Sequence, residues 1–312
     1  MPPPVTPVER KRIVVVGSAG RLGSALVENL GSDHTVIGLT RSQMDLASER
    51  SIADALEPLD YDLLILPAAL TAVDYCETHK EEAFAVNAEA PRTIAMISAA
   101  KGAHVTYVST DFVFDGNKQA PYLETDMPDP VSVYGASKLN GEENVLAVSA
   151  GNLVVRVSWL FGPGKPAFPE WIVDKACNES ELTLPGDKIG SPTYSSDLVG
   201  YMNALLFGIS SVSASGVFHL CNSQPCTWRE WGQFCIDTAR DAGLPVKAGR
   251  IEGVPVDSVP AFVAKRPVNS AMSTEKFSNA TGIRPRDWMA AVREHLLHSD
   301  CFKKYSQPKN AG

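Results

Sequence analysis

The sequence has no excess of positive charge, no long apolar run and no paired-cysteine motif. Its 28 Lys and Arg residues are outnumbered by 36 Asp and Glu residues, which gives a net charge of −8. Proteins that bind the phosphates of nucleic acids need a basic surface, so this balance argues against a nucleic-acid partner. No segment approaches the roughly 18 consecutive apolar residues of a membrane span, so no membrane partner is expected.

The cysteines and histidines form no recognisable ligand cluster. The six cysteines are Cys76, Cys177, Cys221, Cys226, Cys235 and Cys301. Since they include no C-x-x-C pair and no histidine stands at zinc-ligand spacing, we predict reduced thiols, a cytoplasmic location and no metal site. His295 and His298 share a face of the last expected helix and are predicted to be solvated.

The composition is that of a globular protein. Hydrophobic residues make up 44% and charged residues 21% of the chain, which excludes fibrous and disordered classes. A length of 312 residues favours two domains, or one α/β unit with a substrate-binding appendage. Residues 1–11 are proline-rich and lack the apolar segment of a signal peptide, so we expect a mobile leader there.

Short apolar strands alternate with helices from residue 12 onwards. The expected strands cover residues 13–16, 35–39, 62–66, 104–108 and 153–157. The expected helices cover residues 48–56, 80–101 and 133–149, together with a first helix that carries Leu22, Leu26 and Leu30. This alternation requires a parallel sheet with right-handed crossovers. The predicted fold class is therefore α/β, with a Rossmann-like doubly wound sheet over residues 12–160.

A smaller C-terminal lobe is expected after that sheet, because glycines and prolines interrupt the pattern from about residue 161. We assign 161–195 and most of 216–312 to a substrate-binding lobe, and we expect 196–215 to return to the first domain. Within these segments, helices are predicted at 197–207, 227–242 and 286–298 and a strand at 217–220.

A glycine-rich turn joins the first strand to the first helix. Gly17, Gly20 and Gly23 stand there, with Arg21 and Leu22 in the same turn. Such a turn lets the backbone approach a pyrophosphate, which the N-terminus of the helix attracts. The glycine spacing alone also fits a plain strand-to-helix turn. Its position within a βαβ repeat favours a dinucleotide site.

The end of the second strand indicates which cofactor is bound. An acid there bonds the ribose 2′-hydroxyl of NADH, whereas an arginine accommodates the 2′-phosphate of NADPH. Arg41 follows that strand and no acid does, so NADPH is favoured and NADH is kept as the alternative. The other interpretation is that Arg41 only projects into solvent. Asp45 and Leu46 lie further along and are placed beside the adenine.

Two short segments carry the predicted chemistry. Tyr134 and Lys138 stand four residues apart on an expected helix, so both side chains lie on one face. A fixed cation there would favour the phenolate and lower the pKa of the tyrosine. Ser109, Thr110 and Asp111 follow directly on a strand, at the sheet edge where open α/β folds bind ligands. Each segment alone occurs by chance, but their combination with the glycine turn predicts a redox enzyme.

The sequence resembles the extended short-chain dehydrogenase/reductases over residues 12–299, and within them the dTDP-4-dehydrorhamnose reductase family. The matching motifs are Gly17-x-x-Gly20-x-x-Gly23, Ala68-Ala-Leu-Thr-Ala-Val-Asp74, Val86-Asn-Ala88, Ser109-Thr-Asp-Phe-Val-Phe-Asp-Gly116, Tyr122-Leu-Glu-Thr-Asp126, Tyr134-Gly-Ala-Ser-Lys138, Arg156-Val-Ser-Trp159, Gly190-Ser-Pro-Thr193 and Arg266-Pro-Val-Asn-Ser270. The string that begins at Ser109 is specific to this branch, whereas the glycine turn and the Tyr-x-x-x-Lys motif occur throughout the superfamily.

This resemblance implies an NADPH-dependent reductase of a nucleotide-linked 4-keto-6-deoxy sugar, with Thr110, Tyr134 and Lys138 as the catalytic residues. Tyr134 would donate a proton to the C4 carbonyl oxygen as hydride arrives from the nicotinamide. Thr110 would hydrogen-bond the same oxygen, and Lys138 would bind the nicotinamide ribose. The resemblance assigns further residues to the cofactor (Ala68, Ala69, Thr71 and Ser109) and to the substrate (Val73, Asp111, Trp159, Arg266 and Asn269). Trp159 also fits a buried core aromatic.

Three positions depart from the family pattern. Leu66-Pro67 replaces an Asn-Ala pair, and Phe112 replaces a tyrosine, so one amide and one hydroxyl are lost. Some members bind Mg²⁺ at a dimer contact through an acid at the position of Ala25, so neither that metal nor that dimer is carried over. A homodimer of another kind stays open.

Two other functions are kept as alternatives. A cofactor-binding regulatory subunit, similar to the β subunit of methionine adenosyltransferase, would not need the intact Thr110, Tyr134 and Lys138. A nucleotide-sugar epimerase or dehydratase is the other alternative, but dehydratases need a second carboxylate after Asp111, where Phe112 stands. The sequence therefore favours a simple reductase.

Overall fold

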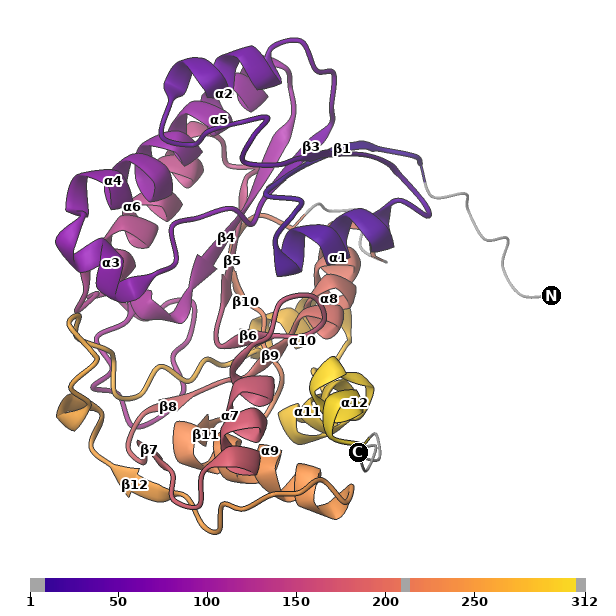
Figure 1. The fold of residues 1–312 in the computed structure, drawn as a ribbon. Helices are drawn as coiled ribbons and strands as arrows, with labels where there is room; N and C mark the ends of the chain where they lie inside the picture. The colour runs from indigo at the N-terminus through magenta and orange to yellow at the C-terminus, as the bar shows by residue number, and fades with distance from the viewer. Residues whose placement is uncertain (1–8, 209–213, 307–312) are drawn as a thin grey trace.

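A six-stranded parallel sheet forms the centre of the protein, which is described by a computed structural model over residues 9–208 and 214–306 (Figure 1). The strands are β1 (Arg12–Val16), β2 (Thr35–Leu39), β3 (Leu63–Leu66), β4 (His104–Thr110), β5 (Leu153–Val157) and β10 (Gly216–His219). Their order is β10-β5-β4-β3-β1-β2. The strand β2 therefore lies on one side of β1, and the chain then crosses over to place β3 on the other side. This reversal confirms the predicted doubly wound fold.

Helices cover both faces of this sheet. They are α1 (Arg21–Leu30), α2 (Glu49–Leu56), α3 (Val73–Thr78), α4 (Lys80–Phe84), α5 (Ala90–Ala100), α6 (Val133–Val148) and α8 (Ser195–Phe207). Side chains of a strand point alternately to opposite faces. Ile13 and Val15 of β1 accordingly pack in the cluster that includes α1 and α8, whereas Val14 and Val16 pack in the one that includes α2 and α5. This is why β1 is apolar at successive positions.

The long helix expected at 80–101 is broken by a wider turn. Residues Ala85–Glu89 form a π-helical turn between α4 and α5. Within it, the Asn87 side chain bonds both backbone groups of Leu70 and the hydroxyl of Ser137. The backbone carbonyl oxygen of Asn87 accepts a hydrogen bond from the Tyr107 hydroxyl. The turn thus fixes the loop after β3 against α6, a tertiary contact that helical periodicity does not reveal.

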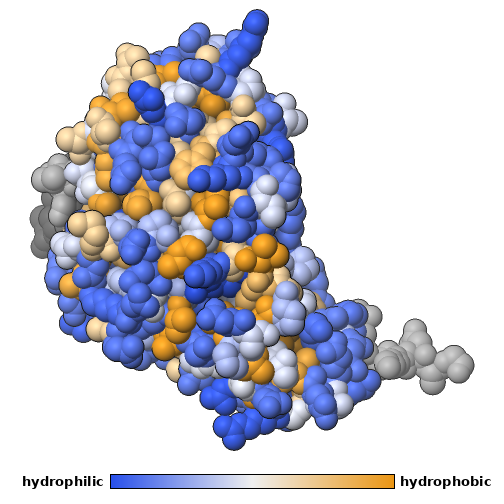
Figure 2. Space-filling view, turned by 90° about the vertical axis from the view of Figure 1, so that its left-hand side faces the viewer, coloured by the Kyte–Doolittle hydropathy of each residue, from blue (hydrophilic) through white to orange (hydrophobic). Residues whose placement is uncertain are grey.

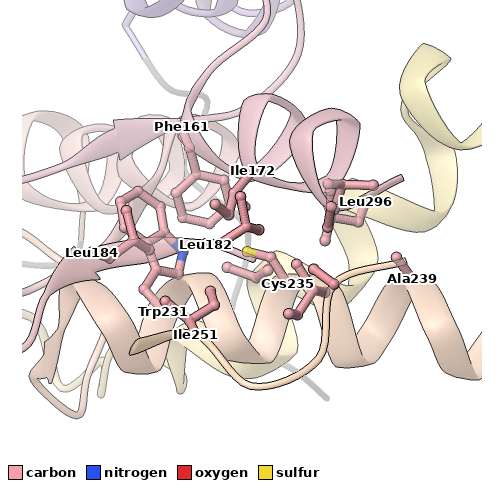
Figure 3. Close-up of a cluster of buried hydrophobic side chains, with 14 of the residues drawn as sticks. Phe161, Ile172, Leu182, Leu184, Trp231, Cys235, Ala239, Ile251 and Leu296 are labelled. Atoms are coloured by element: carbon pink, nitrogen blue, oxygen red, sulfur yellow. The ribbon is translucent and has the colours of Figure 1, made fainter. Parts of the chain in front are cut away.

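The second lobe is built from short strand pairs and five helices within the described residues. Its strands are β6 (Leu160–Phe161), β7 (Thr183–Pro185), β8 (Ile189–Gly190), β9 (Thr193–Tyr194), β11 (Cys226–Thr227) and β12 (Glu252–Val254). Its helices are α7 (Phe168–Asn178), α9 (Trp228–Asp241), α10 (Glu275–Thr281), α11 (Trp288–His298) and α12 (Asp300–Ser306). Figure 3 shows its core, where Trp231, Phe161 and Leu182 lie close together.

Two expectations about this part of the chain need correction. The strand expected at 217–220 was placed in the lobe, but β10 pairs with β5 and forms the edge of the central sheet. Helix α10 also packs on α8 and β10. His295 was expected to be solvated but is only 4% exposed, because it packs against the rings of Phe161 and Tyr194. Its Nε2 lies 2.6 Å from a carboxylate oxygen of Glu170. Five of the six cysteines are buried as free thiols, and Cys301 is half-buried.

The surface shows no single apolar face in the view of Figure 2, where hydrophobic and hydrophilic residues are interspersed over the helices on one side of the sheet. Among the described residues, no helix combines the length and apolar character needed to cross a lipid bilayer. Residues 1–8 of the expected leader, residues 209–213 of the returning segment and residues 307–312 lie outside the described residues.

A buried ion pair joins the sheet to helix α6. Arg156 on β5 contacts Glu142 on α6 at 2.6 Å, and the two side chains are 4% and 3% exposed. Replacing one partner of such a pair leaves a buried charge without compensation.

We therefore expect Glu142→Gln to lower the free energy of unfolding by about 3–5 kcal/mol, measured by urea denaturation followed by circular dichroism. Glu143→Gln, on the same helix but exposed, should change it by less than about 0.5 kcal/mol. Equal losses in the two variants would contradict this assignment.

Candidate active site

A cleft of about 820 Å³ opens along the carboxyl ends of the central strands. Loops after β1, β2, β3, β4 and β5 all contribute residues to it. Of the predicted site residues, it is lined by Gly17, Gly20, Arg21, Leu22, Gly23, Arg41, Asp45, Leu46, Ala68, Ala69, Thr71, Val73, Ser109, Thr110, Asp111, Tyr134, Lys138 and Trp159. The cleft lies where the strand order reverses, the usual ligand position in open α/β sheets.

The glycine turn has the shape that a pyrophosphate requires. Gly17 has a φ of +89°, and a Cβ added to Gly23 would lie 2.1 Å from the carbonyl oxygen of Gly17. Helix α1 starts directly after Gly20, with neither a side-chain cap nor an acid in its first turn. Its first N–H groups therefore face the cleft without a competing anion, and the residues fit the diphosphate of a dinucleotide.

Arg21 bridges this turn to the second lobe. Its guanidinium donates hydrogen bonds to the carbonyl oxygens of Gly162, Pro163 and Lys165, the last at 2.5 Å. Lys165 itself lines the cleft, which sequence reasoning did not anticipate. Its only sequence signal is a position within a glycine- and proline-rich segment.

The rim beside β2 carries charges of both signs. Arg41 and Asp45 line the cleft there and are exposed, which fits both a contact with the cofactor and the alternative that Arg41 only projects into solvent. Glu82, at the same cleft, was not anticipated and accepts a hydrogen bond from Tyr75 at 2.8 Å. Glu82 lies on α4, which follows β3, whereas Arg41 follows β2.

The catalytic candidates are brought together by the close approach of α6 to the end of β4. Ser132 caps α6 by accepting a hydrogen bond from Gly135, and Tyr134 lies in the first turn. A Cβ on Gly135 would lie 2.1 Å from the carbonyl oxygen of Phe112, so the helix starts in contact with the loop after β4. Tyr134 is 8% exposed and hydrogen-bonds Thr110.

Lys138 lies one helical turn further along and points to β4. Its Nζ donates to the Val108 carbonyl at 2.7 Å and lies 3.9 Å from the centre of the Tyr107 ring. Burial lowers the pKa of Lys138 to about 7, although Glu142 favours its charged form.

The expected lowering of the Tyr134 pKa is wrong for this arrangement. Burial raises the pKa of the phenol well above its usual value, and the hydrogen bond with Thr110 only partly offsets this. The sequence rule considered the neighbouring cation but not the loss of solvent around the phenol.

Asp111 is a buried carboxylate next to these residues. Its carboxylate accepts hydrogen bonds from Thr110 at 3.2 Å, Ser158 at 2.9 Å and Ser270 at 2.5 Å. Burial raises the pKa of Asp111, while the nearby charge of Lys188 and these hydroxyl groups oppose the rise. Sequence reasoning assigned no role to Ser158 or Lys188.

Trp159 and Val73 line the cleft on the side expected for the sugar. Trp159 has a φ of +42°, a left-handed conformation that is rare for an aromatic residue. Its ring stacks on Trp231 with the ring centres 5.4 Å apart, and its buried indole N–H has no hydrogen-bond partner. Both interpretations of Trp159 thus describe part of its environment, since it belongs to an aromatic core and faces the cleft.

Arg266 and Asn269 do not line the cleft. Arg266 pairs with Asp74 at 2.5 Å, which lowers the pKa of that carboxyl to about 2, and its guanidinium lies 3.7 Å from the centre of the Phe262 ring. Asn269 donates to the carbonyl oxygens of Lys118 and Gln119. The structure thus engages both side chains within the protein. Among residues 9–208 and 214–306, no group of three or more His, Cys, Asp or Glu side chains is arranged to hold a metal ion.

The chain is similar to reductases of nucleotide sugars. It matches the family model described as RmlD substrate binding domain over residues 11–301. It is 33% identical to the spore coat polysaccharide biosynthesis protein SpsK of Bacillus subtilis (strain 168), a match that covers 91% of this chain and 96% of SpsK. It is 31% identical to the dTDP-4-dehydrorhamnose reductase of Escherichia coli (strain K12), over 91% of this chain and 96% of that enzyme.

Solved structures show the same relationship. The crystal structure of dTDP-4-dehydrorhamnose reductase from Bacillus anthracis str. Ames in complex with NADP has a TM-score of 0.85 and 27% identity, covering 93% of this chain and 100% of that one. The UDP-glucose 4-epimerase of Thermotoga maritima, at 17% identity and a TM-score of 0.76, shares the fold alone. Because the family model spans nearly the whole chain and the relatives match over most of their length, this protein belongs to the RmlD family, the family of the dTDP-4-dehydrorhamnose reductases.

Proposed function

We propose that this protein is an NADPH-dependent reductase of the C4 keto group of a nucleotide-linked 4-keto-6-deoxy sugar. The observation that carries the proposal is that Thr110, Tyr134 and Lys138 meet in one cleft with the glycine turn. The names of the relatives, dTDP-4-dehydrorhamnose reductase, support the substrate class, and the NADP of the Bacillus anthracis structure supports the cofactor.

The cofactor would be held by residues from three parts of the sheet edge. Gly17, Gly20 and the N-terminus of α1 would bind its diphosphate, Arg41 its 2′-phosphate, and Lys138 its nicotinamide ribose. When bound, NADPH supplies the hydride for the reduction. NADH is retained as the alternative cofactor, since only Arg41 distinguishes the two in this assignment.

Tyr134 would act as the proton donor. The phenol is protonated at neutral pH and can give its proton to the carbonyl oxygen of the sugar, although burial raises its pKa and makes it a weaker acid. Thr110, whose hydroxyl hydrogen is donated to Asp111, would orient the Tyr134 phenol beside the same oxygen. Lys138, whose pKa is about 7, would stabilise the negative charge that proton transfer leaves on the phenol oxygen.

The substrate assignments differ in how directly the cleft supports them. Val73, Asp111 and Trp159 line it and would surround the sugar. Arg266 and Asn269 are proposed for the nucleotide part, where a guanidinium suits a diphosphate. This requires the diphosphate to compete with Asp74 for Arg266.

The position of Phe112 supports a simple reductase over a dehydratase. Its ring packs edge-on against Tyr134, with the ring centres 5.5 Å apart, where elimination of water would need a second carboxylate. A cytoplasmic location stays part of the proposal, on the basis of the free cysteine thiols.

We expect Tyr134→Phe to reduce kcat by about 10²–10⁴-fold with little change in KM, because it removes the proton donor and keeps the ring. The assay follows the loss of nicotinamide absorbance when the protein is mixed with NADPH and dTDP-4-keto-6-deoxymannose. Tyr61→Phe is the matched control, since Tyr61 is also buried but bonds Ser98 away from the cleft. Tight NADPH binding by the wild type without turnover of any keto-sugar nucleotide would favour a regulatory role instead.

We expect Arg41→Ala to weaken NADPH binding by about ten- to a hundredfold and to leave NADH binding nearly unchanged, because a charge-assisted bond to the 2′-phosphate is lost. Fluorescence titration with each cofactor measures both affinities. Arg50→Ala removes the same charge from an exposed position on α2 and should affect neither. Equal weakening of both cofactors by Arg41→Ala would show that Arg41 does not distinguish them.

A further inference from the structure

A buried polar cluster lies behind Thr110, and only one of its members, Asp111, has a place in the proposed function so far. Its members come from distant segments: Asp111 follows β4, Ser158 follows β5, Lys188 precedes β8, and Ser270 lies between β12 and α10. Each of them is at most 2% exposed. A lysine with no exposed surface is rare in proteins unless it is paired, so its surroundings call for a physical explanation.

Hydrogen bonds connect Lys188 to Thr110 without interruption. The Nζ of Lys188 donates to the hydroxyl of Ser270 at 3.2 Å and to the carbonyl oxygen of Pro267 at 2.5 Å. Ser270 donates to one carboxylate oxygen of Asp111, and Thr110 donates to the other. The chain of donors therefore runs from both ends towards Asp111.

The surroundings of Lys188 leave Asp111 as its buried countercharge. Two aromatic residues of the cleft wall, Phe112 and Trp159, have ring centres 5.3 and 5.9 Å from its Nζ. Of the charged side chains that act on it, Asp111 and Asp187 favour its positive charge and Arg266 opposes it. Asp111 in turn acts on the Tyr134 phenol and makes ionisation of that group harder.

The protonation state of Asp111 determines whether the Thr110 hydroxyl donates or accepts the hydrogen bond between them. A hydroxyl has one hydrogen and two acceptor sites. Thr110 gives its hydrogen to Asp111, accepts the backbone N–H of Phe112 at 3.2 Å, and bonds Tyr134. If Asp111 were protonated, it could donate to Thr110 instead, and the direction of the bond would reverse.

We propose that Lys188 is a positioning residue for the reduction: through Ser270 it holds Asp111 as a carboxylate, and Asp111 fixes the orientation of the Thr110 hydroxyl beside Tyr134. This inference rests on the proposed function. Without the charge of Lys188, either the carboxylate acts on Tyr134 uncompensated and makes it a weaker acid, or it takes up a proton and the Thr110 hydroxyl turns. Both changes slow proton donation.

The pH dependence of this arrangement follows from burial. Burial lowers the pKa of Lys188 to about 8, and the charge of Asp111 offsets part of this shift. Lys188 therefore loses its proton as the pH rises through about 8. We expect kcat of the wild type to fall over that range.

The test compares wild type with Lys188→Met and Lys188→Arg by nicotinamide absorbance, from about pH 6 to about pH 10. Lys188→Met should lower kcat at neutral pH about tenfold, the effect of one pKa unit at Tyr134. It should also remove the fall near pH 8 and leave only the earlier fall that loss of the Lys138 proton causes near pH 7. The KM values for NADPH and for the keto-sugar nucleotide should both stay within about threefold of wild type. Lys188→Arg keeps the charge, so it should retain more activity and shift the fall to higher pH.

A serine pair provides a matched control should either Lys188 variant fail to fold. Ser158 and Ser270 each donate to the same oxygen of Asp111, but Ser270 also accepts from Lys188. Ser270→Ala should therefore reduce kcat more than Ser158→Ala, with folding of each checked by circular dichroism.

Three results would overturn the inference. A wild-type kcat and pH profile in Lys188→Met would do so, as would equal losses in Ser158→Ala and Ser270→Ala. An inactive wild type would overturn it together with the proposed function. An active wild type whose Tyr134→Phe variant fails as expected leaves the proposed function standing, whichever way the Lys188 variants behave.

Discussion

The active-site geometry depends on how closely helix α6 approaches the sheet. Two glycines permit this approach: a Cβ on Gly135 would lie 2.1 Å from the Phe112 carbonyl oxygen, and one on Gly141 would lie 2.1 Å from that of Asn87. With the helix seated there, Tyr134 reaches Thr110 and Lys138 reaches the Val108 carbonyl at the end of β4. A methyl group at either glycine would displace α6, and with it Tyr134 and Lys138, because protein interiors are close-packed.

Local patterns in the sequence predicted strands β1 to β5 of the central sheet and many of the residues that line the cleft. The apolar run at 13–16, the glycine turn and the spacing of Tyr134 and Lys138 are each encoded within a few residues. The family resemblance added Ala68, Val73 and Trp159, and the structure places all three in the cleft. Their individual roles remain predictions.

What the sequence could not predict are contacts between distant segments. Lys188 and Ser270 reach Asp111 across 77 and 159 residues, respectively. His295 was expected on a solvated face, but Glu170 of α7 covers it. The pKa of Tyr134 rises rather than falls for the same reason, since burial comes from packing that no i, i+4 pattern reveals.

Arg21 has a consequence for how the two lobes work together. Arg21 belongs to the turn that would hold the cofactor diphosphate. Its guanidinium nevertheless donates hydrogen bonds to three backbone carbonyl oxygens of a loop at the start of the second lobe. That loop is therefore organised by folding rather than by ligand arrival, so the conformational entropy of ordering it does not have to be lost at each catalytic cycle. One arginine thus ties the glycine turn to the start of the second lobe.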